Sequence, residues 1–339
     1  MANAASNYAP FTADEKFRRK LELSKPYHET HRDTEFPWFL RQQVENFRAR
    51  LAGGGVKQCA LVVIGDSNSG KSKMLEHHLA LIPELQPKLG EDGEYYSPVL
   101  KMEAPASCST KSFAIALLSA IGIPASSRAS EFELYAVLKR VLKQNRIECI
   151  VVDEMQHAIR GTADGTIKKV QDVFKSLLQI DDWPIHLILL GTSEMRRFLE
   201  GDRQLANRCR VMRLIPVSYQ DPLATNKVRE IVEKIVVEYG GLKIGWTDED
   251  SMIERLMRSG RGALGAIFET TKEACFRAID EDRDTVTKAD FVAVYKVNTG
   301  CLPQDNIFES ANWKTINPAF AVADLADGDP LPPKRRRAA

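Results

Sequence analysis

The sequence lacks the features that would assign it to several special classes of protein. Its six cysteines, at positions 59, 108, 149, 209, 275 and 301, include no C-x-x-C pair, which argues against a zinc site or a disulfide framework and favours free thiols. No apolar run approaches the roughly 20 residues that cross a bilayer, and the first residues lack the apolar core of a signal peptide. We therefore expect a cytoplasmic protein that has no membrane partner.

The chain also lacks a large net charge of either sign. Lysine and arginine number 47 and aspartate and glutamate 46, so the formal net charge is +1. Any binding of nucleic acid must therefore come from a local basic face rather than from the charge of the whole chain. Hydrophobic residues make up 44% of the sequence, enough for a sizeable core. The length of 339 residues predicts two domains at about 150 residues per domain.

The most informative stretch is residues 65–72, which read G-D-S-N-S-G-K-S and match the phosphate-loop pattern G-x-x-x-x-G-K-[ST]. An apolar run precedes it and a helix-forming run follows, so it has the strand–turn–helix context that the motif requires. Its glycines let successive N–H groups point at phosphate oxygens, and the start of the helix adds its positive end. Lys71 is predicted to reach the β- and γ-phosphates, and Ser72 to ligate Mg²⁺. The predicted nucleotide contacts in this stretch are Gly65, Asp66, Ser67, Asn68, Ser69, Gly70, Lys71, Ser72 and Lys73.

Polar residues end two further apolar runs. Residues 150–154 read I-V-V-D-E, and a carboxylate at the end of a buried strand can meet a phosphate loop across the crevice of a parallel sheet. Asp153 is predicted to hold Mg²⁺ through water, and Glu154 to polarise the attacking water. After the run 187–190, Thr192 is predicted to place a hydroxyl beside the γ-phosphate, with Ser193 as the alternative. A helix N-cap is a second interpretation of Thr192.

Two arginines are predicted to contribute positive charge to the nucleotide site. Arg208 precedes a predicted strand and is predicted to stabilise transition-state charge in the site of a neighbouring subunit. Arg210 and Arg203 are the alternatives for this role. Arg261 lies in the glycine-rich turn 259–265 and is predicted to fold onto the nucleotide. The alternative for this turn is a helix start that packs closely at its glycines. His31 and Arg32 are interpreted as the leader of a surface helix, and a border of the adenine pocket is the alternative.

Hydrophobic patterning divides the chain into five parts. Strands and helices alternate over 58–216, as in a parallel α/β sheet, with strands predicted at 59–64, 98–103, 147–152, 185–190 and 211–215. Amphipathic helices fill 217–299. A helical extension at 31–57 precedes the sheet, and a loosely held arm occupies 1–30. Residues 300–339 are predicted to be a partner-binding or disordered tail, because they are rich in proline and aspartate and end in the basic run 334–337.

Taken together and in this order, these pieces resemble an AAA+ ATPase, and within that superfamily the TniB/TnsC group of transposition regulators. The resemblance is carried by residues 65–72, 99–105 with Lys111, 152–157, 190–192 and 204–208. It implies an α/β fold with an AAA+ P-loop core, in which helices flank a parallel sheet, followed by a C-terminal α-helical lid domain. It also implies that ATP and Mg²⁺ are the cofactors and that the chain is an enzyme that hydrolyses ATP.

The resemblance further implies the partners of the chain. Members of this group oligomerise on double-stranded DNA as a helical filament or ring and connect target-selection adaptors of the TniQ/TnsD type, with or without an RNA-guided complex, to a DDE transposase. Hydrolysis then drives disassembly. Lys111 falls where a lysine that tracks DNA is expected, and Ser130 or Arg128 falls near a second contact with the DNA backbone. The alternative for this region is ordinary helix starts, in which Ser109 or Thr110 is a cap.

Three other functions compete with this interpretation. An AAA+ helicase loader or clamp loader would have a similar nucleotide site and lid. A non-hydrolysing adaptor would use ATP only to hold subunits together. A P-loop kinase is disfavoured because it would not need the adjacent acidic pair at 153–154.

Overall fold

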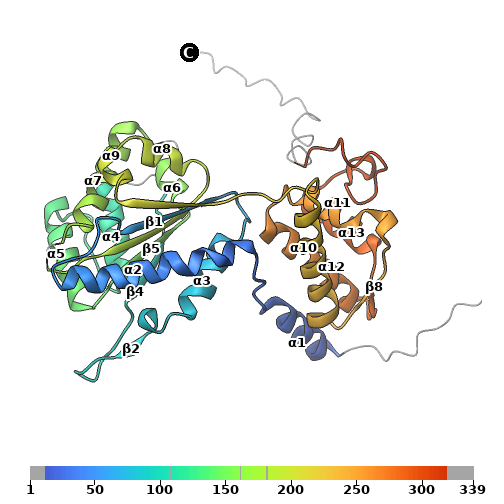
Figure 1. Ribbon diagram of the computed structural model, residues 1–339, viewed down its shortest axis with the longest axis horizontal. Coiled ribbons are helices and arrows are strands. Elements are labelled where there is room, and N and C mark those ends of the chain that lie inside the picture. The colour runs from blue at the N-terminus through green and yellow to red at the C-terminus, as the bar shows by residue number, and fades with distance from the viewer. Residues whose placement is uncertain (1–11, 107–108, 161, 181, 319–339) are drawn as a thin grey trace, which may run out of the picture. The chain divides into compact units, whose positions relative to one another are not determined.

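The chain forms two compact units in the computed structural model, which describes residues 12–106, 109–160, 162–180 and 182–318 (Figure 1). One unit comprises residues 29–215. The other comprises the described residues up to His28 together with those from Pro216 onward. The chain therefore passes from the first unit to the second between Ile215 and Pro216.

The first unit is built on a five-stranded parallel sheet. Its strands are β4 (Val99–Glu103), β5 (Cys149–Asp153), β6 (His186–Gly191), β1 (Ala60–Gly65) and β7 (Cys209–Leu214), in that spatial order. Every residue of β6 is buried, which explains why its sequence is a continuous apolar run rather than an alternating one. Because all five strands are parallel, their carboxyl ends meet at one edge of the sheet, which is where parallel sheets bind ligands.

Helices flank this sheet and complete its core. They are α2 (Phe36–Leu51), α3 (Lys71–Ala80), α4 (Thr110–Ala120), α5 (Glu131–Gln144), α6 (Gln156–Ile159), α7 (Asp164–Leu177), α8 (Met195–Glu200) and α9 (Arg203–Ala206). Three buried rings join α4, α7 and α8, with Phe174 edge-to-face against Phe113 at 5.0 Å and Phe198 at 5.6 Å. A short antiparallel ribbon, β2 (Lys88–Leu89) and β3 (Tyr95–Tyr96), precedes β4. The predicted α/β fold with a parallel sheet between helices is confirmed.

The second unit is mainly helical. Its elements are α1 (Ala13–Ser24), α10 (Pro222–Glu233), the π-helix η3 (Lys234–Tyr239), α11 (Met252–Ser259), α12 (Leu264–Asp280), α13 (Lys288–Thr299) and the parallel pair β8 (Lys243–Ile244) and β9 (Thr285–Val286). The predicted C-terminal helical region is therefore present. Within the described part of the chain, no helix combines the length and the apolar character needed to span a bilayer.

The two ends of the described chain are more ordered than the sequence suggested. Helix α1 lies where we expected a loosely held arm; it begins with a capping box between Thr12 and Glu15, and its Leu23 is fully buried in the core of the second unit. Ile307 and Phe308 are also fully buried there, although we expected a tail from residue 300. Isolated apolar residues carry no periodic signal, so their burial was not predictable. The predicted basic run 334–337 lies outside the described residues.

Candidate functional site

The phosphate-loop residues form a tight curl between β1 and α3. Gly70 caps α3 with a φ of 90° and Asn68 has a φ of 59°, a left-handed region that glycine and asparagine tolerate best. A Cβ at Gly65 would lie 2.7 Å from the Ser69 Oγ atom and 3.0 Å from the Leu214 Cβ atom, so a larger residue there would displace the Ser69 side chain of the loop. The sequence therefore folds locally as the motif predicts.

Lys71 places its charge inside this curl. The side chain is only 5% exposed, and its Nζ atom donates to the carbonyl oxygens of Gly65 and Asp66 at 2.9 Å each. Burial lowers the pKa of the Lys71 ammonium, while the carboxylates of Glu154, Asp153 and Asp66 oppose that shift. These carboxylates favour the charged form that a phosphate would need.

Ser72 and Asp153 meet although 81 residues separate them in the sequence. The Ser72 hydroxyl donates to the Asp153 Oδ2 atom at 2.5 Å, which joins the first turn of α3 to the end of β5. A hydroxyl and a single carboxylate beside a phosphate loop are oxygen ligands that Mg²⁺ prefers. The donor set therefore fits the predicted magnesium ion.

Glu154 follows directly and is held by Gln156, which belongs to the run 152–157 but received no predicted role from the sequence. Its φ of 51° is unusual for a residue other than glycine. The buried Gln156 side chain donates its Nε2 hydrogen to the Glu154 carboxylate, and its Oε1 atom accepts the Thr192 N–H at 3.2 Å. Gln156 thus bridges the two strand ends. The only sequence signal was an amide two residues after the acidic pair.

Thr192 completes this edge of the sheet. Strand β6 lies between β1 and β5, so the residue that follows it stands between the phosphate loop and the acidic pair. The Thr192 hydroxyl is buried and has no hydrogen-bond partner among the described residues. No side chain caps α8, so the N-cap alternative for Thr192 does not describe its hydroxyl. A buried unpaired hydroxyl at a ligand edge is suited to contact a substrate.

Of the predicted arginines, Arg208 directly precedes β7 and Arg210 is its second residue, so both lie at the amino ends of the strands, away from the carboxyl ends that carry the phosphate loop. The Arg208 carbonyl accepts the N–H groups of Cys59 and Ala60, at the amino end of β1. The phosphate loop begins at Gly65, five residues further along β1 than Ala60, so roughly 16 Å of strand separates Arg208 from the loop of its own chain. Arg210 stacks over Trp38 at 4.9 Å, and Arg203 is exposed on α9. The structure does not bring these arginines to the loop within one chain.

Arg261 belongs to the second unit, so its contact with the nucleotide stays a prediction. It has a φ of 53° in the turn between α11 and α12 and lines a pocket of about 670 Å³ with Arg258 and Tyr219. A Cβ on the neighbouring Gly262 would lie 2.3 Å from the Val217 carbonyl oxygen, so the close glycine packing offered as the alternative is present as well.

The predicted DNA-contacting residues gather at the starts of α4 and α5. The two starts are joined because the Thr110 hydroxyl donates to the Glu131 carboxylate at 2.6 Å. Ser130 caps α5 by a capping box with Glu133. The N–H and hydroxyl of Ser130 both donate to the Glu133 carboxylate at 2.8 Å, and Lys111 directly follows Thr110, so the Thr110–Glu131 bond holds the Lys111 backbone close to the start of α5. The exposed Arg128 lies two residues before Ser130, so the structure brings all three together.

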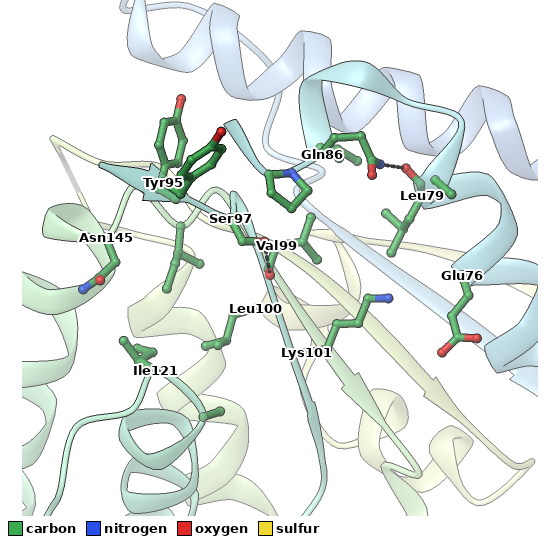
Figure 2. A pocket seen from close by; sticks show the side chains of 16 residues that line it. Glu76, Leu79, Gln86, Tyr95, Ser97, Val99, Leu100, Lys101, Ile121 and Asn145 are labelled. Carbon is green, nitrogen blue, oxygen red and sulfur yellow. Dashed lines mark hydrogen bonds between the residues drawn. The ribbon is translucent and has the colours of Figure 1, made fainter. Parts of the chain in front are cut away.

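A separate pocket of about 570 Å³ lies beside the edge strand β4 (Figure 2). Tyr95, Leu100 and Lys101 line it, with Glu76 from α3 and Asn145 from the turn after α5. None of the residues 65–73 lines this pocket, so it is distinct from the candidate nucleotide site.

Comparison with known proteins shows a family and a fold. The sequence pattern of the family described as bacterial TniB protein matches residues 51–219. None of the curated proteins matches the chain. Among solved structures, Cdc6p from Pyrobaculum aerophilum has a TM-score of 0.57 and 14% identity and covers 85% of this chain and 76% of its own. The ORC1 protein from Aeropyrum pernix in complex with DNA has a TM-score of 0.55 and 16% identity, with 86% and 74% covered.

The ORC2 protein from Aeropyrum pernix, solved as ADPNP and ADP complexes, is similar as well. Its TM-score is 0.54 and its identity 13%, with 84% of this chain and 75% of its own covered. At such identities the likeness shows the fold alone, which is that of AAA+ proteins. Through residues 51–219, the chain belongs to the bacterial TniB protein family.

Proposed function

We propose that this chain is an ATPase that uses Mg²⁺, acts in the cytoplasm and oligomerises on double-stranded DNA as a helical filament or ring. It connects target-selection adaptors of the TniQ/TnsD type, with or without an RNA-guided complex, to a DDE transposase, and ATP hydrolysis disassembles it. Family membership supports the proposal. The observation that carries it is that the Ser72–Asp153 pair and the Gln156 bridge lie at the same sheet edge as the phosphate loop.

Each residue at this edge has a distinct role in the proposed hydrolysis. The loop N–H groups and Lys71 bind the phosphates, and Ser72 and Asp153 hold Mg²⁺, which would neutralise phosphate charge. Glu154 accepts a hydrogen bond from the attacking water, and Gln156 fixes the carboxylate in place. The unpaired Thr192 hydroxyl donates to the γ-phosphate or to that water.

The site is incomplete within one chain. Arg208 lies at the opposite edge of the sheet from the phosphate loop, so its guanidinium stabilises the transition state only in a neighbouring copy. ATP bound at one protomer is then completed by the next, which is the physical reason for ATP-dependent assembly. Arg261 is the second predicted cation at this nucleotide.

DNA binding is proposed for the surface formed by Lys111, Arg128 and Ser130. Two adjacent helix starts carry the cations Lys111 and Arg128, which suit phosphates and carry no sequence information, beside the carboxylates of Glu131 and Glu133, which accept from Thr110 and Ser130. The fold of an ORC1 protein solved in complex with DNA is similar. Replacing Lys111 or Arg128 with alanine should weaken binding uniformly across DNA sequences and reduce the salt slope by about 1 each. Arg140→Ala, at an exposed site later on α5, is the control.

The decisive experiment combines phosphate release with electron microscopy of the purified full chain, ATP, Mg²⁺ and duplex DNA. Lys71→Ala should abolish ATP-dependent DNA binding, and Glu154→Gln should assemble without turnover. Lys169→Ala, at an exposed site on α7, should match the wild type. Wild-type protein that stays monomeric and ignores duplex DNA at saturating ATP would refute the proposal.

The two rival functions have different outcomes in the same experiment. A loader or remodeller should hydrolyse ATP without forming an extended coat on DNA. A non-hydrolysing adaptor should coat DNA without releasing phosphate, and its Glu154→Gln variant should behave as the wild type.

A further inference from the structure

Arg32 is buried behind the phosphate loop although the sequence suggested the leader of a surface helix. It lies in the 3₁₀-helix η1 (His31–Thr34) and is only 6% exposed. Thr30 and Asp33 form a capping box around it, and the Asp33 carboxylate contacts the His78 Nε2 atom on α3 at 2.6 Å. The segment is therefore fixed to the helix that follows the phosphate loop.

The guanidinium of Arg32 bridges two distant parts of the first unit. Its Nη1 atom donates to the Ser69 carbonyl in the phosphate loop, and its Nη2 atom donates to the Ile215 carbonyl after β7, each at 2.8 Å. A rigid planar fork holds two acceptors at a fixed spacing, whereas a lysine ammonium is a compact point charge on a flexible stem. Ile215 is the last residue before the chain enters the second unit.

The contact with Ser69 determines the direction of a phosphate-binding group. In a trans peptide unit, the carbonyl of one residue and the N–H of the next point to opposite sides. Because Arg32 holds the Ser69 carbonyl from behind, the Gly70 N–H points away from Arg32. Gly70 has a φ of 90° and no side chain to restrict it, so this peptide unit needs an external anchor.

We propose that Arg32 is a positioning residue that orients the Gly70 N–H for phosphate and ties the phosphate loop to the exit of the chain at Ile215. This inference rests on the proposed nucleotide site. When the Gly70 N–H donates to a phosphate oxygen, the carbonyl of the same peptide unit is the group that accepts from Arg32. Nucleotide occupancy is thereby transmitted to Ile215, the last residue before the second unit.

The test compares Arg32→Lys and Arg32→Ala in the full chain with Arg41→Lys, a matched control at an exposed site on α2. Affinity for ATP and ADP is measured by calorimetry with Mg²⁺, well below the melting temperature of each variant. Hydrogen exchange is followed in peptides that cover residues 212–218, with and without saturating ADP. Arg32→Lys should bind both nucleotides about tenfold more weakly, the effect of losing one well-oriented hydrogen bond.

At saturating ADP, the nucleotide-dependent change in exchange at 212–218 should be present in the wild type and in Arg41→Lys but absent from Arg32→Lys. A purely structural role would lower the melting temperature and leave both readouts unchanged, which would overturn the inference. If Arg32→Ala does not fold, Arg32→Lys alone decides the question. Wild-type protein that binds no adenine nucleotide would overturn the proposed function, and the inference with it. Wild-type binding with unchanged affinity and exchange in Arg32→Lys would overturn only the inference.

Discussion

Replacing Gln156 with methionine tests whether the bridge between the strand ends controls ATP turnover. Methionine preserves most of the side-chain volume at this buried position and removes both hydrogen bonds, one to the Glu154 carboxylate and one from the Thr192 N–H. The Glu154 carboxylate then loses a partner that holds it in position, while the phosphate loop and the Ser72–Asp153 pair keep their contacts.

The size of the effect follows from the bond that is lost. A hydrogen bond to a charged group contributes about 1.5–3 kcal/mol, and each 1.36 kcal/mol of transition-state stabilisation corresponds to about a tenfold change in rate. We therefore expect kcat to fall by between about tenfold and about a hundredfold. The KM for ATP should stay near its wild-type value, because the phosphate loop keeps its contacts and Gln156 bonds the Thr192 N–H rather than the hydroxyl proposed to contact the γ-phosphate.

The assay is steady-state phosphate release at saturating ATP with duplex DNA, beside urea unfolding of the same proteins. Gln171→Met is the matched control, because Gln171 is equally buried and its amide donates to the Phe198 carbonyl between α7 and α8. Both variants should lose stability, and only Gln156→Met should lose turnover. Unchanged kcat in Gln156→Met, or equal losses in the two variants, would refute the reasoning.

Three further predictions follow from single contacts. Gly65→Ala should weaken nucleotide binding in calorimetry, because the new methyl group would lie 2.7 Å from the Ser69 Oγ atom and displace it, whereas an alanine at the open position Gly165 should have no effect. Arg208→Ala and Lys71→Ala should each be inactive alone and regain ATPase activity when mixed, because Lys71→Ala supplies the arginine and Arg208→Ala supplies the intact phosphate loop. No recovery on mixing would contradict action between subunits. Burial and the charge of Arg50 lower the pKa of His186 from 6.5 to about 3, so below pH 6.5 the unfolded chain binds a proton that the folded chain excludes. The contribution of His186 to the free energy of unfolding is therefore complete above pH 6.5 and is about 2 kcal/mol smaller near pH 5. In urea unfolding, the free energy of unfolding of His186→Gln should fall less between these two pH values than that of the wild type.

The sequence predicted those parts of the fold and the site that depend on local patterns. The phosphate loop is one continuous motif, and the apolar runs before Gly65 and Asp153 are strands buried on both faces, so the α/β fold and the family were predicted and are confirmed. The roles of the individual site residues remain predictions.

The contacts that the sequence could not predict join residues far apart in the chain. Arg32 lies 37 residues before Ser69 and 183 before Ile215, and nothing in its neighbourhood marks it as buried. The packing of Leu23 and of the Ile307–Phe308 pair into the second unit likewise depends on long-range burial, because so few apolar residues in polar surroundings show no period of a helix or a strand.

The position of Arg208 opposite the phosphate loop would give a direction to an assembly formed as we propose. Under the roles proposed for the phosphate loop and Arg208, each protomer would offer a nucleotide on one side and an arginine on the other, which is a head-to-tail interface rather than a two-fold symmetric one. An open row of n copies then contains n − 1 complete catalytic centres and leaves one unfinished at its terminus, whereas a closed ring contains n. Growth and shrinkage at the two termini are consequently inequivalent, and activity per copy rises with the length of the row.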